Sequence, residues 1–164
     1  MTIAGDCSSF TCRYPALEPH IEDLLPKKGD TIVCKCKDYV QLILGPDGEF
    51  IFFQCRNGPF IPTIRLLHKY PDILPKFQVD RGAIRFVLSG ANIMAPGLTS
   101  AGGSMDDVPE GTTVAIFAEG KEHALAIGVT MASTATIRSE NKGNAIENTH
   151  WLNDGLWIMR TGAL

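Results

Sequence analysis

Residues 79–100 read VDRGAIRFVLSGANIMAPGLTS and combine a capped helix with a run of small residues. Asp80 is a typical helix N-cap, because its carboxylate can accept a hydrogen bond from an N–H group of the first turn. Gly90 suits the position just after the helix, where the backbone often becomes left-handed. The helical spacing predicts a buried stripe of Ala83, Ile84, Val87 and Leu88. Arg81 and Arg85 then share the opposite, solvent-facing side.

The second part of this stretch predicts a strand over residues 92–95 and a Pro-Gly turn at residues 96–97. Ile93 and Met94 are neighbours in that strand, so only one of them can face outward. Two guanidinium groups beside such a turn suit a phosphodiester backbone and an unstacked terminal base. Alternatively, the glycines serve only as caps and turns. The candidate RNA contacts are Arg81, Gly82, Ala83, Arg85, Met94, Ala95, Pro96 and Gly97.

The remainder of the second half contains short segments with the period of a strand. We predict strands over residues 113–119, 124–130, 145–150 and 156–160. Many short strands with one helix inserted early predict a small pseudo-barrel.

The first half predicts a separate α+β unit. Its helices are expected over residues 15–25 and 63–70, the second with Thr63 as its N-cap. Its strands are expected over residues 31–36, 39–44 and 49–55. Prolines surround the second helix, and we place the domain junction near residues 71–76.

The composition is that of an ordinary globular protein, with 45% apolar and 20% charged residues. It excludes a disordered tail and a coiled coil, and no apolar stretch is long enough to span a bilayer. The net charge of −3 argues against nucleic-acid binding by bulk charge alone. Residues 56–85, however, carry six Lys or Arg against two Asp, whereas residues 106–154 carry three against eight Asp or Glu. The first window predicts a surface that attracts polyanions, or else an ordinary solvated surface.

The sequence has few features of an enzyme. It lacks the glycine-rich nucleotide, P-loop, nucleophile-elbow and zinc-protease motifs. The histidines are scattered, and we predict that none forms a catalytic dyad or a metal-binding face. Four cysteines, Cys7, Cys12, Cys34 and Cys36, could supply thiolates, but their spacing does not match structural zinc sites. A Cys34 or Cys55 nucleophile would need a base that the sequence does not place. We therefore predict no catalysis, no metal and no cofactor.

Longer motifs resemble known families. Residues 79–103, VDRGAIRFVLSGANIMAPGLTSAGG, resemble the core signature of the PUA domain, the RNA-binding module named after pseudouridine synthases and archaeosine transglycosylases. The chain also resembles the malignant T-cell-amplified sequence family of translation factors in the order and spacing of LLPKKGD, FFQCRNGPFIPTIRLLHKYPDILPKFQVDRGAI, VAIFAEGKEHALAIGV, NKGNAIEN and HWLNDGLW. This likeness extends over residues 15–159.

The resemblance implies an N-terminal α+β domain, residues 1–75, followed by a C-terminal PUA pseudo-barrel, residues 76–164. It implies a cytoplasmic RNA-binding protein that acts on the small ribosomal subunit with a density-regulated protein homologue and contacts no membrane. The expected role is to assist initiator tRNA recruitment or tRNA release in noncanonical initiation, re-initiation and ribosome recycling. The alternative is a PUA-type accessory protein that targets RNA or assists ribosome assembly.

Under the first interpretation, the site residues hold the acceptor end of a tRNA. Arg81 and Arg85 neutralise phosphates, while the small residues and Met94 approach the backbone and the terminal bases. The candidates for contact with ribosomal RNA are Lys27, Lys28, Arg65 and Lys69, which are otherwise ordinary surface lysines and arginines.

The start of the chain departs from the family pattern. Family members usually carry a longer segment before the position of Pro15, and residues 1–14 look unrelated to it. The expected consequence is that Phe50, Phe52 and Phe53 are more exposed than usual, which would create an apolar surface patch.

Overall fold

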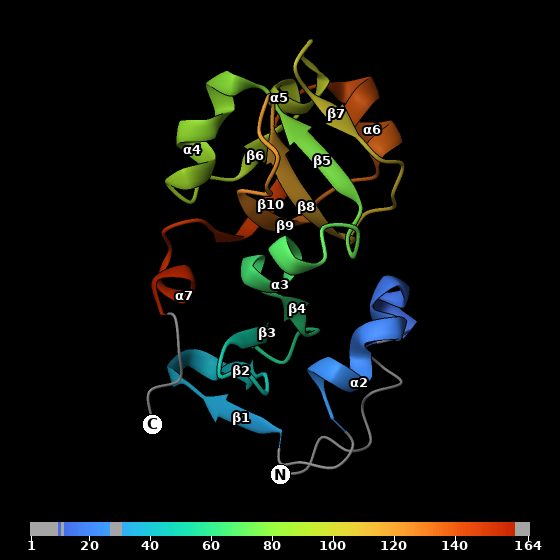
Figure 1. Ribbon diagram of the computed structural model, residues 1–164. Helices are drawn as coiled ribbons and strands as arrows, with labels where there is room; N and C mark the ends of the chain where they lie inside the picture. The colour runs from blue at the N-terminus through green and yellow to red at the C-terminus, as the bar shows by residue number, and fades with distance from the viewer. Residues whose placement is uncertain (1–9, 11, 27–30, 160–164) are drawn as a thin grey trace. The chain divides into compact units, whose positions relative to one another are not determined.

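The chain folds into two compact units, each with its own sheet (Figure 1). The computed structural model describes residues 10, 12–26 and 31–159. The first unit contains residues up to Ile73 together with Met159, and the second contains Leu74–Ile158. None of the helices in this described part has the length and apolar character that a membrane span requires.

The first unit is built on a four-stranded antiparallel sheet whose strands follow the order of the sequence. The strands are β1 (Ile32–Lys35), β2 (Val40–Leu44), β3 (Phe50–Cys55) and β4 (Ile61–Pro62). The helices are the 3-10 helix η1 (Pro15–His20), α2 (Ile21–Leu24), the 3-10 turn η2 (Lys37–Tyr39) and α3 (Ile64–Lys69). The Thr63 hydroxyl caps α3 as predicted, because it accepts a hydrogen bond from the Leu66 N–H at 3.3 Å.

Strand β3 is buried along most of its length. Its first four residues are all buried: Phe50, Ile51, Phe52 and Phe53. The ring centroids of Phe10 and Tyr14 lie 4.8 Å and 6.3 Å from that of Phe52. The expected exposure of Phe50, Phe52 and Phe53 is therefore wrong, and residues before Pro15 supply aromatic cover for Phe52.

The second unit is built on a six-stranded sheet with the order β6-β10-β9-β8-β5-β7. The strands are β5 (Lys76–Val79), β6 (Ile93–Met94), β7 (Ser104–Met105), β8 (Thr113–Ala118), β9 (Ala126–Thr130) and β10 (Asn144–Trp151). Strands β5 and β8 run parallel, and the other neighbours run antiparallel. The sheet curls into a half-barrel (Figure 1), which confirms the predicted fold class of an α+β unit followed by a pseudo-barrel.

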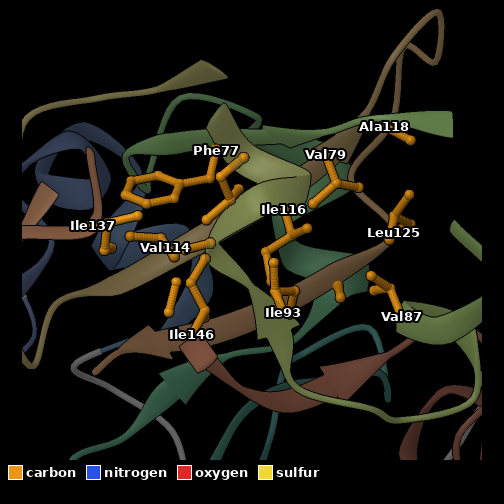
Figure 2. Close-up of a cluster of buried hydrophobic side chains, with 14 residues drawn as sticks. Phe77, Val79, Val87, Ile93, Val114, Ile116, Ala118, Leu125, Ile137 and Ile146 are labelled. Atoms are coloured by element: carbon orange, nitrogen blue, oxygen red, sulfur yellow. The ribbon is translucent and has the colours of Figure 1, made fainter. Parts of the chain in front are cut away.

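Short helices cover this sheet and close its core. They are the 3-10 helix η3 (Arg81–Ala83), α4 (Ile84–Leu88), α5 (Ala95–Thr99), α6 (Thr134–Glu140) and α7 (Gly155–Ile158). Figure 2 shows Phe77, Val114 and Ile116 among the buried side chains, to which α4 and α6 add Val87 and Ile137. Burial of this much apolar surface is the main stabilising contribution to the unit.

Helix α4 is fixed at both ends, as the sequence predicts. The Asp80 Oδ1 atom accepts a hydrogen bond from the Ala83 N–H at 2.9 Å, which caps η3 and the helix that continues from it. Gly90 follows the helix with a φ of +84°, and a Cβ there would lie 2.6 Å from the Trp151 ring. The Asn148 Nδ2 atom of β10 donates to the Val87 carbonyl at 3.0 Å and to the Ala91 carbonyl at 3.1 Å. Strand β10 therefore holds the C-terminal end of α4.

Two predicted elements are wrong. Pro96 and Gly97 lie inside α5 rather than in a turn, because a proline near the start of a helix removes an N–H that has no partner within the helix. The strand predicted over residues 156–160 is instead α7 as far as the structure describes it. The Asp154 Oδ1 atom accepts a hydrogen bond from the Trp157 N–H at 2.8 Å, and this local cap favours a helix over a strand.

The packing of α4 on Trp151 predicts that Gly90→Ala destabilises the protein more than Gly111→Ala. Both glycines have a positive φ, of +84° and +77°, but a Cβ on Gly111 would meet nothing within 4 Å. The control therefore isolates the backbone cost of about 1 kcal/mol, whereas Gly90→Ala also overpacks the Trp151 contact at about 1–3 kcal/mol more. Denaturant unfolding measures both variants, and equal losses would show that Trp151 moves aside without cost.

Candidate nucleic-acid interface

The candidate interface lies where the parallel strands β5 and β8 end. Their last residues, Val79 and Ala118, are paired, so the residues that follow both strands emerge at one edge of the sheet. The Glu119 N–H donates to the Val79 carbonyl at 2.9 Å. A Cβ on Gly120 would lie 3.4 Å from the Arg81 Nη2 atom. The start of η3 and the connection between β8 and β9 therefore lie side by side.

Arg81 and Arg85 are both exposed, and within the described residues neither has a carboxylate partner. The Arg85 guanidinium carbon lies 4.6 Å from the centroid of the Phe86 ring. Guanidinium groups that are not paired within the protein can bind phosphate through several N–H donors at once. Both arginines are exposed, as predicted, whereas only Val87 of the predicted stripe is buried, and Ala83, Ile84 and Leu88 are half-buried against the core.

Asp80 holds η3 and α5 together. Its Oδ2 atom accepts a hydrogen bond from the Ser100 hydroxyl at 2.9 Å, and its own N–H donates to the Gly97 carbonyl at 3.1 Å. A Cβ on Gly97 would lie 3.5 Å from the Ala83 Cβ, so the two helices are in close contact there. Gly82 and Pro96 are exposed beside this contact. The structure thus brings the two parts of the predicted contact set together.

In the strand before α5, one residue faces the core and the other faces the solvent. Met94 is 54% exposed and Ile93 is buried, which settles which of the two faces outward. Ala95, by contrast, is only 1% exposed. Its side chain packs in the core, so the expectation that it contributes to the contact surface is wrong.

Phe86 is a surface residue that the sequence analysis missed. Its ring is 51% exposed and lies beside the Arg85 guanidinium. Exposed aromatic rings stack on unpaired bases. The signal was present in the sequence, because Phe86 falls outside the helical stripe of Ala83, Ile84, Val87 and Leu88.

The basic residues proposed for ribosome contact differ in how far their charge is available to bind RNA. The Lys69 Nζ atom lies 2.7 Å from Asp47 Oδ2 and 2.9 Å from Glu49 Oε2. These hydrogen bonds raise the pKa of Lys69, and the bond from Lys69 lowers the pKa of Asp47. Arg65 is half-buried. Lys27 and Lys28 lie outside the described residues.

The structure bears on Cys55, one of the two cysteines considered as nucleophiles. Burial raises the pKa of the Cys55 thiol, which opposes formation of the nucleophilic thiolate. Within residues 10, 12–26 and 31–159, no group of three or more His, Cys, Asp or Glu side chains could hold a metal ion.

One histidine does pair with a carboxylate, contrary to the expectation that none forms a dyad. The His150 Nδ1 atom lies 2.6 Å from Asp154 Oδ2, four residues further along the chain. Burial acts to raise the pKa of Asp154, but hydrogen bonds from His150 and from the Trp157 N–H outweigh it, so the pKa is lowered. His150 is only 1% exposed, so the pair joins β10 to α7 and is closed to a substrate. The spacing of four residues was the signal that could have identified it.

Comparisons with known proteins agree with this architecture. The PUA domain family matches residues 75–152, and the Pre-PUA-like domain family matches residues 7–71. The second match includes part of the segment before Pro15 that the sequence analysis regards as unrelated to the family.

Similar proteins cover nearly the whole chain. Malignant T-cell-amplified sequence 2 of Mus musculus is 53% identical over 97% of this chain and 87% of its own length. The malignant T-cell-amplified sequence 1 homolog of Drosophila melanogaster is 56% identical over 88% of this chain and 79% of its own length. A hypothetical protein from the archaeon Pyrococcus horikoshii shares the fold, with a TM-score of 0.77 at 23% identity over 96% of each chain.

The free guanidinium groups predict that Arg81→Glu combined with Arg85→Glu weakens binding to a hairpin RNA with an unpaired 3′ end. The logarithm of the association constant falls as the logarithm of the salt concentration rises. The magnitude of this slope should decrease by about one unit for each arginine replaced. Lys35→Glu combined with Lys37→Glu changes the net charge equally on exposed residues of the first unit and serves as the control. Titrations at several salt concentrations measure both, and identical losses in the two variants would contradict an interface at Arg81 and Arg85.

The His150–Asp154 pair predicts a stability difference that depends on pH. Since the pKa of Asp154 in the folded state lies below its ordinary value of 3.8, the ionised carboxylate stabilises the fold above that value. Asp154→Asn should therefore be less stable than the unchanged protein at pH 7, and the difference should shrink as the pH falls below about 4. Thermal unfolding at both pH values measures this, with the exposed Glu110→Gln as the control. A difference that persists undiminished at low pH would contradict the assignment.

Proposed function

The chain belongs to the malignant T-cell-amplified sequence family, and from this premise we propose that it is an RNA-binding translation factor of the small ribosomal subunit. In this proposal it assists initiator tRNA recruitment or tRNA release in noncanonical initiation, re-initiation and recycling. The PUA domain, an RNA-binding module, supports the RNA-binding part of the proposal. The ribosomal and tRNA roles rest on the family resemblance and on the chemistry of the interface.

The observation that carries the proposal is that Arg81 and Arg85 are exposed and have no carboxylate partner among the described residues, and that the Phe86 ring lies beside Arg85. Arg81 and Arg85 supply charge for phosphates, and Phe86 and Met94 offer surface to bases that are not stacked in a helix. A duplex would present only its backbone to such a surface, whereas a single-stranded end can also place bases on it. The acceptor end of a tRNA has this character.

In this proposal each domain has its own binding role. Residues 76–164 hold the tRNA end, and residues 1–75 contact the ribosome and a density-regulated protein homologue. Lys27, Lys28 and Arg65 are the ribosome-contact candidates. Lys69 would first have to leave Asp47 and Glu49, so we rank it below the others. Function in the cytoplasm follows from the same proposal.

We infer that the protein acts by binding rather than by catalysis. The raised pKa of the Cys55 thiol and the burial of His150 support this inference. The alternative, an accessory protein in ribosome assembly, would use the same interface on structured RNA. Sedimentation separates the two, because association only with precursor particles favours assembly and association with mature small subunits favours translation.

Recognition of an unpaired end predicts that a tRNA trimmed of its terminal unpaired nucleotides binds markedly worse than the intact tRNA. The reason is that the surface around Phe86 and Met94 can accept a splayed base but not a stacked pair. The measurement is a competition titration at two salt concentrations, on the full chain with its partner and the small subunit. A duplex RNA of equal charge is the control and should bind only through the salt-sensitive contacts. Equal competition by trimmed and intact tRNA would overturn end recognition.

A further inference from the structure

Two turns at one end of the first unit's sheet contain strained residues. The connection between β1 and β2 holds Asp38 and Tyr39, both with a φ of +59°. The connection between β3 and β4 holds Arg56 and Asn57, with φ values of +48° and +59°. Four of the six described non-glycine residues with a positive φ therefore belong to these two turns. We call the two turns together the double turn, residues 36–39 and 56–58.

Backbone hydrogen bonds hold the double turn together. The Arg56 N–H donates directly to the Tyr39 carbonyl at 3.1 Å. This bond continues the antiparallel pairing of β2 with β3, in which Val40 lies opposite Cys55. The Gly58 N–H in turn donates to the Cys55 carbonyl at 2.9 Å, which closes the second turn. The backbones of Tyr39 and Arg56 are therefore fixed next to each other.

Tyr39 and Arg56 are not the residue types that this backbone conformation favours. Asparagine and aspartate adopt a positive φ several times more often than other non-glycine residues, whereas a bulky side chain there is an outlier. Burial of the two side chains does not offset the cost, because Tyr39 is 78% exposed and Arg56 is exposed as well. Strained backbone of this kind concentrates at functional sites. A ligand that binds from solvent would account for both side chains.

The double turn offers an accessible aromatic ring together with positive charge. Within the part of the chain that the structure describes, Arg56 forms no ion pair and the Tyr39 hydroxyl forms no hydrogen bond. Lys37 is also exposed, so the two cations of the double turn outnumber its one carboxylate, that of Asp38. An exposed ring can stack on an unpaired base, and a guanidinium group can bind a phosphate. A nucleotide of RNA supplies both groups.

We propose that Tyr39 stacks on an unpaired base of ribosomal RNA in the small subunit and that Arg56 binds the adjoining phosphate. This inference rests on the proposed function and gives the first unit a defined contact on the ribosome. One stacked base and one phosphate contact are too weak to hold a free hairpin RNA. The double turn therefore adds to binding that the second unit also provides, and its effect is measurable on the small subunit rather than on a hairpin.

The test of Tyr39 measures the dissociation constant of the full chain, with its protein partner, for isolated small ribosomal subunits. Tyr39→Asn removes the ring but keeps a residue type that tolerates the left-handed backbone, so the affinity should fall roughly tenfold without loss of thermal stability. Tyr39→Phe keeps the ring and should restore the affinity. Asn153→Gly, at an exposed residue with a φ of +73° outside the double turn, is the control and should bind as the unchanged protein does.

The test of Arg56 is the salt dependence of the same binding. Arg56→Asn removes the charge and keeps a residue type that tolerates a positive φ. The logarithm of the association constant falls as the logarithm of the salt concentration rises, and the magnitude of this slope should decrease by about one unit. Arg13→Asn removes the same charge from another exposed residue of the first unit and should leave the slope unchanged. Ultraviolet irradiation of the bound complex should attach a nucleotide to Tyr39.

The outcomes separate this inference from the proposed function. Binding to small subunits that depends on Arg81 and Arg85 but survives Tyr39→Asn and Arg56→Asn overturns the role of the double turn alone. Weaker binding by these variants with no nucleotide attached to Tyr39 indicates a protein contact and overturns the RNA contact. Absence of binding by the unchanged protein overturns the ribosomal function and the inference with it. Weaker binding by Tyr39→Asn that Tyr39→Phe restores, with a nucleotide attached to Tyr39, supports the proposal.

Discussion

The candidate interface depends on the hydrogen bonds of one carboxylate, that of Asp80. One oxygen accepts from the Ala83 N–H and the other from the Ser100 hydroxyl, while the Asp80 N–H donates to the Gly97 carbonyl. These bonds begin the helix that carries the arginines and fix α5 against it. Because Asp80 directly follows β5, the position of the whole interface is set by the sheet.

At the interface, the availability of positive charge to a ligand matters as well as its amount. Lys69 is neutralised by Asp47 and Glu49, and Arg138 by Asp107, whose Oδ1 atom lies 2.7 Å from the Arg138 Nη1 atom. Surface pairs of this kind contribute little to stability, but they occupy the donors that a phosphate would use. Among the described residues, no carboxylate pairs with Arg81 or Arg85. A protein with a net charge of −3 can therefore still present a local site for a polyanion.

The features that could be predicted from the sequence are those decided within a few residues. The caps of Thr63 and Asp80 are bonded three residues away, and the stripe around Val87 follows from helical spacing alone. The wrong predictions have two kinds of cause, contacts between residues distant in the sequence and local hydrogen bonds that favour a different element. The cover of Phe52 comes from Phe10, far away in the sequence, and the cap of Asp154 converts a strand-like apolar run into a helix. The closeness of η3 to the connection after β8 could not be predicted either, because it depends on the pairing of two strands that are distant in the chain.

That pairing also has a consequence for how the protein folds. Strands β8 and β9 are joined by a short connection and can form early as a hairpin, whereas β5 must find β8 across a long intervening segment. The loop-closure entropy of such a non-local parallel contact makes its formation slow. The start of η3 and the connection that follows β8 become neighbours only after that contact exists. A nascent or partly folded chain therefore carries both segments but not their arrangement, and the ability to recognise a ligand there arises with completion of the sheet.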